Sequence, residues 1–304
     1  MTEQQVAPDA EGGGPNRGLG HLVGEPEVVP DDQHPGDRPV DDVTQVRLRW
    51  WVEVGTLLVM YVVYSGIRNR FGSATVGPEH AFNNARWIID VERSLGLFFE
   101  PDLQQAFLGQ KWFLQFWNVF YGTFHFWVTA FALIWCYRKR PHVYSFWRNT
   151  IVLTTLVALV GFSLFPLMPP RLLGNCGEFG YCGVDYGFVD TLARYGGLWS
   201  FDSGAMEQIS NQYAAMPSLH FAWSTWTFLV LYGHFKRTWV NIAIATYPWV
   251  TLFAIIVTAN HYWLDAAGGA LALSVGLALS WCVRQVTSRW WGRPAAPTPA
   301  DATA

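Results

Sequence analysis

Charged residues are scarce in this sequence. Of its 304 residues only 14% are Asp, Glu, Lys or Arg, whereas 51% are hydrophobic and 16% are aromatic. Soluble globular domains carry about 25% charged residues. The composition therefore argues against an ordinary soluble protein and predicts a chain that buries much of its surface in a membrane.

Acidic residues are especially rare in the C-terminal third. Between Glu207 and Asp301 the sequence contains one acidic residue, Asp265. A lone carboxylate in a long apolar region is energetically costly, so its presence indicates a functional role. It follows His261 by four residues, so on a helix the two side chains lie on one face. We therefore take His261 and Asp265 as the centre of a candidate catalytic site.

Cysteine is also sparse, with four residues in the chain. Cys136 and Cys282 lie at the ends of apolar stretches and are predicted to be reduced packing residues. Cys176 and Cys182 lie in one loop and are predicted to form a short disulfide. A metal site is a weaker interpretation, because this loop has no nearby His or third Cys. The sequence predicts no metal and no other cofactor.

The two ends of the chain lack the residues needed for a core. Residues 1–44 carry ten acids and two arginines, a balance of −8 that leaves +5 for the remainder. They have no basic start followed by an apolar run, so they do not resemble a signal peptide. We predict disordered tails at 1–44 and 291–304. The acidic tail is interpreted as a solvated leader, with a partner-binding role left open.

Between these tails lie apolar stretches of the length that crosses a bilayer, roughly 20 residues. They predict an all-α fold, an integral membrane six-helix bundle over residues 45–290. Pro248 predicts a kink in the fifth stretch. The six predicted spans are Arg49–Gly66, Trp112–Cys136, Trp147–Leu167, Ser218–Phe235, Trp239–Thr258 and Tyr262–Val283.

The distribution of Lys and Arg predicts the orientation of this bundle. The links between spans two and three and between spans four and five are basic, as is the C-terminal end. We therefore predict a multi-pass protein of the cell membrane with both termini in the cytoplasm. This topology places Pro217 and His261 at the outer face.

Two outer segments have distinct patterns. Residues 79–108 show helical spacing of apolar residues among balanced charges, which predicts an interfacial helix. A helix packed on the other outer loops is an equally good interpretation. Residues 168–216 are predicted to form a long outer loop.

The predicted topology brings several reactive side chains to this outer face. Asp265 would orient the imidazole of His261, which becomes a candidate nucleophile that forms a phosphohistidine. His220 is the candidate general acid and base. Arg171 and Ser218 are candidate phosphate-binding residues. The spans that begin near Ser218 and His261 also present helix N-termini, which favour an anion.

Plainer interpretations exist for three of these side chains. Arg171 could be a basic residue at a helix end whose side chain reaches the interface, and Ser218 could be only a helix N-cap. His125 is read first as a hydrogen-bonded membrane histidine and second as a candidate pocket residue. The 17 tryptophans are interpreted as membrane-belt and packing residues, so no nucleic-acid partner is predicted.

At these residues the chain resembles the type-2 phosphatidate phosphatase superfamily, in particular the branch containing inositol phosphorylceramide synthase. The resemblance covers about Ala81 to Leu279 and rests on Pro217-Ser218-Leu219-His220 and on His261-Tyr262-Trp263-Leu264-Asp265. It implies a six-helix membrane core in which the two histidines and the aspartate perform the roles given above. Leu164 and Ile255 stand where the family has a Lys and an Arg. The Pro169-Pro170-Arg171 form is closer to the synthase-like branch.

The predicted function is therefore a membrane phosphatase or phosphotransferase, inositolphosphotransferase-like, acting on a lipid phosphate or phospholipid. Water and an alcohol both remain open as acceptors, and the sequence gives no oligomeric state. Two other classes remain open. One is a metal-dependent membrane hydrolase, and the other is a transporter or scaffold that only binds a lipid phosphate.

Overall fold

A computed structural model describes residues 50–71, 76–196 and 212–291, all within the unit Gln45–Ala304. The described part is helical and contains no strand, only two isolated β-bridges. The predicted tails at 1–44 and 291–304 lie outside the described residues, except for Trp291, which is the last residue of the helix Trp263–Trp291. The all-α prediction is confirmed for the part of the chain that is described.

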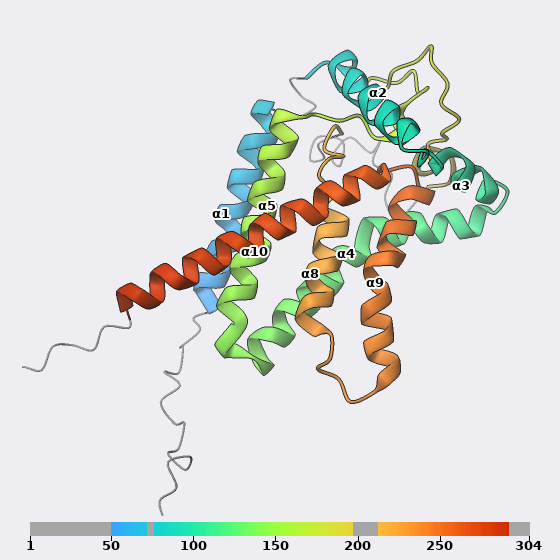
Figure 1. The fold of residues 1–304 in the computed structure, drawn as a ribbon. Helices are drawn as coiled ribbons and strands as arrows, with labels where there is room; N and C mark the ends of the chain where they lie inside the picture. Colours follow the sequence, from blue (N-terminus) through green and yellow to red (C-terminus); the bar gives the residue numbers. More distant parts are fainter. Residues whose placement is uncertain (1–49, 72–75, 197–211, 292–304) are drawn as a thin grey trace, which may run out of the picture. The chain divides into compact units, whose positions relative to one another are not determined.

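Five described helices are long and apolar enough to cross a membrane (Figure 1). Large apolar side chains project outward from them, including Trp127, Trp249 and Leu271. Such exposure is expected where hydrocarbon replaces water. These five are α1 (Trp50–Phe71), α4 (Lys111–Lys139), α5 (Pro141–Leu164), α9 (Thr238–Val257) and α10 (Trp263–Trp291).

The fourth predicted span, Ser218–Phe235, contains a shorter helix. α8 runs from Leu219 to Leu231, 13 residues, whereas crossing a bilayer takes about 20. Ser218 caps its start, and Gly233 has a positive φ of 80° just beyond its end. The six-helix count therefore remains a prediction.

The boundaries of α5 differ from the predicted span Trp147–Leu167. The helix begins at Pro141, so that Arg140 alone separates it from α4. Proline is favourable at the first helical position, because its missing N–H would have no helical partner there. The helix ends at Leu164, since Pro166 disfavours helical geometry at Phe165.

The predicted interfacial helix at 79–108 is wrong in its continuity, because the segment contains two helices. α2 (Pro78–Ser94) and α3 (Glu100–Phe107) are separated at Gly96, which has a φ of 68°. The Leu97 N–H closes the end of α2 on the Glu92 carbonyl at 2.8 Å. A left-handed glycine with this bond ends a helix.

One face of α2 packs on the loops rather than facing outward. Its buried side chains form a core with the segment that follows α5 and with the start of α10. The buried face of α2 therefore supports the interpretation that this helix packs on other loops. A location of α2 at the membrane interface stays a prediction. The core includes Ala81, Phe82, Ala85, Ile88, Ile89, Leu167, Met168, Leu172, Tyr213, Ala215 and Tyr262.

α10 packs against both α5 and α8, and glycines permit the close approach (Figure 1). A Cβ at Gly269 would lie 2.3 Å from the Ser218 carbonyl oxygen, and one at Gly276 would lie 2.2 Å from the Thr154 hydroxyl oxygen. The backbones therefore come closer than any side chain would allow. This approach sets the distance between the first turns of α8 and α10.

Gly269→Ala is expected to push α10 away from the start of α8. Overpacking of this kind costs about 1–3 kcal/mol, so we expect a lower unfolding temperature in detergent and reduced turnover. Gly66→Ala is the control, since a Cβ there meets nothing within 4 Å. Wild-type stability and turnover in Gly269→Ala would contradict this account of the packing.

Candidate active site

The link between α9 and α10 positions His261. After α9 ends at Val257, Ala259 adopts a positive φ of 54°. The N–H groups of Asn260 and His261 then both turn back to the Ile255 carbonyl, at 3.0 and 3.2 Å. This tight closure places His261 just before the first turn of α10, buried with 3% of its surface exposed.

Two oxygens hold the Nδ1 atom of His261. The Ala215 carbonyl oxygen lies 2.9 Å away and the Asp265 Oδ2 lies 3.2 Å away. A carbonyl can only accept, so Nδ1 carries the proton and Nε2 keeps its lone pair. Asp265 is fully buried, and its Oδ2 also accepts from the Tyr262 N–H at 2.9 Å. The contact with Ala215 has no sequence signal, because any residue supplies a carbonyl.

His220, in the first turn of α8, faces the free nitrogen of His261. Its Nδ1 lies 3.3 Å from the His261 Nε2. The His220 ring stacks on Tyr121 of α4, with centroids 4.3 Å apart and an interplanar angle of 23°. The three predicted catalytic side chains, His220, His261 and Asp265, therefore form one connected cluster.

A narrow hollow, too small to admit a water molecule, lies beside His220, between α4, α8 and α9. His125 forms part of its wall, with its ring centroid 4.2 Å from that of His220 and its Nδ1 2.9 Å from the Tyr121 carbonyl. The sequence did not predict the other polar residues of this wall, Tyr121, Tyr247 and Thr251, because the stretches that form α4 and α9 were interpreted only as apolar membrane spans. The lining residues are Phe120, Tyr121, His125, His220, Tyr247, Thr251, Ala254 and Ile255.

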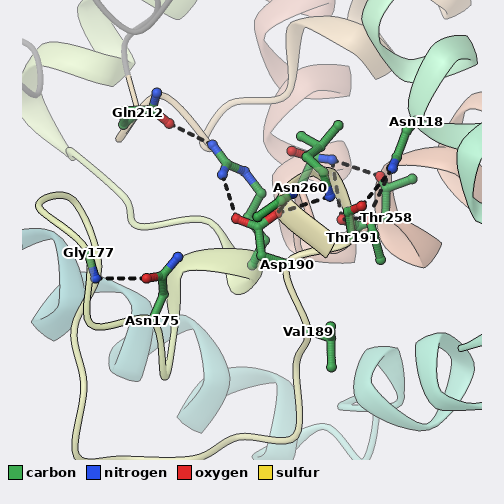
Figure 2. A network of polar contacts seen from close by, with 12 residues as sticks. Asn118, Asn175, Gly177, Val189, Asp190, Thr191, Gln212, Thr258 and Asn260 are labelled. Carbon is green, nitrogen blue, oxygen red and sulfur yellow. Dashed lines mark hydrogen bonds and ion pairs between the residues drawn. The ribbon is translucent and has the colours of Figure 1, made fainter. Parts of the chain in front are cut away.

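Arg171 is buried in a short helical turn, η1 (Pro170–Leu172), rather than at the end of α5. Its guanidinium donates to Asp190 at 3.0 Å and to Gln212 at 2.6 Å; Figure 2 shows these two residues approaching from different sides. Its backbone N–H donates to the Ala259 carbonyl at 2.7 Å. Arg171 is thus attached to the link that carries His261, while its guanidinium is engaged by protein groups.

Asp190 also organises the loop between α5 and α8. Its Oδ1 caps α6 (Thr191–Tyr195) by accepting two backbone N–H bonds at 3.0 Å. Thr191 then donates to Asn118 of α4 at 2.9 Å and to the Thr258 carbonyl at 3.3 Å (Figure 2). The loop is fastened to α4 and to the end of α9, so the surroundings of Arg171 are fixed from three elements.

Ser218 is fully buried at the N-cap of α8. Its hydroxyl accepts from the Phe221 N–H at 3.5 Å, and its own N–H donates to the Asp265 carbonyl at 2.8 Å. The N-cap interpretation therefore accounts for its contacts. The bond to Asp265 joins the first turns of α8 and α10 directly.

The expected anion site at the start of α10 is already occupied by the protein. The N–H groups of Tyr262, Trp263 and Leu264 donate to carboxyl oxygens of Asp265, Glu100 and Glu92. The expectation that this helix end holds a substrate anion is therefore wrong. The start of α8 is the helix terminus that remains for a phosphate.

Cys176 and Cys182 are exposed free thiols whose side chains lie within hydrogen-bonding distance. The Cys182 side chain raises the pKa of the Cys176 thiol. The disulfide stays a prediction: mass analysis without reductant should find the two residues linked, and full alkylation of both would contradict it.

The fold and the site together define a class. Long apolar helices surround a histidine pair, the buried His261 and the partly buried His220, braced by a carboxylate, an arrangement able to support nucleophilic and acid–base catalysis. A family model described as PAP2 superfamily matches residues 86–279, well over half of the chain. The chain belongs to the PAP2 superfamily, and membership supports a membrane protein of phosphatase type. Comparisons with curated proteins and with solved structures return no match.

The two positions where the family's basic residues are replaced have different surroundings. Leu164 is 79% exposed at the end of α5, whereas Ile255 is fully buried in the wall of the hollow beside His220. An apolar side chain thus stands close to His220 where the family pattern places an arginine.

Asp265→Asn is expected to lower turnover by about 10²–10⁴-fold, because an amide cannot stabilise the positive charge that His261 gains during reaction. The Ala215 carbonyl should still hold the same tautomer, so the fold and the ring orientation should persist. Turnover and thermal stability in detergent test this. A wild-type rate in this variant would show that the carboxylate only supports the structure.

Proposed function

We propose that this protein is a membrane lipid-phosphate phosphatase or phosphotransferase that works through a phosphohistidine intermediate. The observation that carries the proposal is the orientation of His261. Its Nδ1 is held by two acceptors, and its Nε2 is directed at a second histidine. An imidazole fixed in this way is prepared for nucleophilic attack.

In the first step the His261 Nε2 attacks phosphorus, and the bond from phosphorus to the lipid oxygen breaks. The leaving oxygen takes a proton from His220, and Asp265 stabilises the charge on His261. In the second step His220 removes a proton from water or an alcohol, whose oxygen attacks phosphorus. The P–N bond breaks, and His261 returns to its starting state.

In the resting structure His220 stands on the approach to the nucleophile. The 3.3 Å separation of its Nδ1 from the His261 Nε2 leaves no room for a phosphoryl group between them. Substrate binding therefore requires the His220 ring to move, and the side chains around it must move as well, because the adjoining hollow is too small to admit even a water molecule. His125 is proposed as a wall of this pocket rather than as a reacting group.

Arg171 and Ser218 are the proposed phosphate-binding residues. Support for Arg171 comes from its buried guanidinium, whose Nε has no hydrogen-bond partner within the described ranges. A planar guanidinium binds phosphate oxygens in pairs. Substrate would compete with Asp190 and Gln212 for the two NH₂ groups. Ser218 would contribute through the start of α8.

The lipid substrate would reach the site from the outer leaflet of the cell membrane, with both chain termini in the cytoplasm. The basic links described above support this orientation. Transfer to an alcohol, as in an inositolphosphotransferase-like reaction, is the finer proposal. The apolar Leu164 and Ile255 support it, because they set the chain apart from the common phosphatase pattern.

The test is an incubation of the full chain in detergent with a panel of phosphorylated lipids, with and without candidate alcohols. Release of free phosphate indicates a phosphatase, and a new phosphodiester indicates a transferase. A parallel reaction with a chelator separates the metal-dependent alternative, since a phosphohistidine mechanism should persist. Binding without turnover across the panel would favour the transporter or scaffold.

A further inference from the structure

The first turn of α10 is held by acidic side chains from other helices. The Trp263 N–H donates to the Glu100 Oε1 at 3.2 Å, and the Leu264 N–H donates to the Glu92 Oε1 at 3.2 Å. These groups are among those that a helix start leaves without a helical partner. Glu92 comes from α2 and Glu100 opens α3, so the break between those helices brings both carboxyls to one place.

Neither carboxyl has access to water or a nearby cation. Both residues are fully buried, and neither forms an ion pair within the described part of the chain. Their remaining oxygens, the two Oε2 atoms, find no donor among the described groups. The two side chains lie within hydrogen-bonding distance of each other. A single proton shared between the two carboxyls would give each of them a hydrogen-bond partner.

The surroundings oppose two negative charges at this place. The ionisable groups that face the pair are Asp265 and Tyr262 of the α10 start and, beyond Tyr262, Tyr186 of the outer loop. All three are acids, and none is a base. Burial, followed by the neighbouring Glu100, raises the pKa of Glu92 to about 10. Two close buried carboxyls cannot both ionise near neutral pH.

We propose that Glu92 and Glu100 share one proton and act together as positioning residues that hold the start of α10, and with it His261, in the reactive orientation. This role rests on the proposed function, because it concerns the placement of the nucleophile. The shared proton itself does not depend on catalysis. It leaves one negative charge at the positive end of α10, where a helix start favours it.

The shared proton predicts how stability varies with pH. A carboxyl whose pKa is raised in the folded state binds its proton more tightly there than in the unfolded chain. Its contribution is therefore fully present below the ordinary pKa of 4.5 and is lost as pH rises towards about 10. Glu92→Gln replaces the neutral acid by a neutral amide and removes this dependence.

The first experiment compares unfolding temperatures of the full chain in detergent at pH 6 and pH 9. The unfolding temperature of Glu92→Gln minus that of wild type should be more positive at pH 9 than at pH 6. The control is Asp90→Asn, an exposed acid on the same helix, whose difference from wild type should not change with pH. A pH-independent difference for Glu92→Gln would overturn the shared proton, whatever the protein's activity.

The second experiment tests positioning with a lipid phosphate that the wild type turns over. Glu92→Ala leaves the Leu264 N–H without its acceptor and should lower kcat by about 10²-fold with little change in KM, the scale expected for a misplaced reacting group. Glu92→Gln should restore most of this loss. If both variants lose kcat equally, the positioning role is wrong. If no lipid is turned over by wild type, the proposed function fails, and the pH experiment still decides the shared proton.

Discussion

Replacing His261 by glutamine is expected to reduce lipid-phosphate turnover by about 10⁴-fold or more, because the bond-forming nitrogen is lost. Glutamine retains a polar side chain of similar length that can still donate to the Ala215 carbonyl. The fold should therefore survive, which thermal unfolding in detergent would verify. Turnover is followed as phosphate release, or as phosphodiester formation if an alcohol is required.

The matched control for this substitution is His80→Gln. His80 is exposed on α2, so the same change in chemistry there should leave turnover near the wild-type level. A His261→Gln protein that is folded and still active would remove the nucleophile assignment. A protein that is inactive but unfolded would instead point to the structural role of the link between α9 and α10.

Replacing His220 by glutamine is expected to separate the two chemical steps. With a lipid phosphate, loss of the general acid should lower turnover by about 10²–10⁴-fold. A nitrophenyl phosphate has a leaving group that departs without a proton, so the first step should still proceed. The second step still needs a base to activate water. The phosphoenzyme should therefore accumulate, and a burst of nitrophenol should equal the amount of enzyme.

The result that would contradict this role is a full steady-state rate in His220→Gln with the lipid substrate. Absence of a burst with the nitrophenyl ester, in a folded protein, would also count against it, because attack by His261 should not require His220 there. His261→Gln should give neither a burst nor steady turnover. The pair of variants thus distinguishes a nucleophile from an acid and base.

The sequence predicted most of the site because side-chain chemistry and local spacing are visible in it. The four-residue interval between His261 and Asp265 predicts their contact, and the fourth and sixth spans, which are predicted to begin at the same membrane face, bring His220 near them. The apolar spans of α1, α4, α5, α9 and α10 followed from length and composition. These features depend on periodicity, which a single sequence records.

Features that depend on backbone and on long-range contacts were not predictable. The Ala215 carbonyl that fixes the His261 tautomer has no residue-specific signal. Glu92 read as a charge on an amphipathic helix, because its burial depends on the break at Gly96 that brings α3 beside α2. Likewise Arg171 read as a free cation, whereas the loop places Asp190 and Gln212 against it.

The engaged state of Arg171 alters the expected order of events at the site. In the proposed mechanism a substrate phosphate would displace protein acceptors from the guanidinium and would move the His220 ring away from His261. Both adjustments would involve side chains of the loop between α5 and α8 and of the first turn of α8. The backbones at the starts of α8 and α10 would stay together, because Gly269 lies too close to Ser218 for any side chain to fit between them.

The most direct measurement is isolation of the covalent intermediate. Wild-type protein is incubated briefly with a ³²P-labelled substrate, denatured in alkali and mapped by peptide mass analysis. We expect a phosphoryl group on His261, labile in acid and stable in alkali, that is absent in His261→Gln. Label on a residue other than His261 would contradict this mechanism. So would turnover by wild type without any labelled protein, under conditions in which the phosphoenzyme of His220→Gln is trapped.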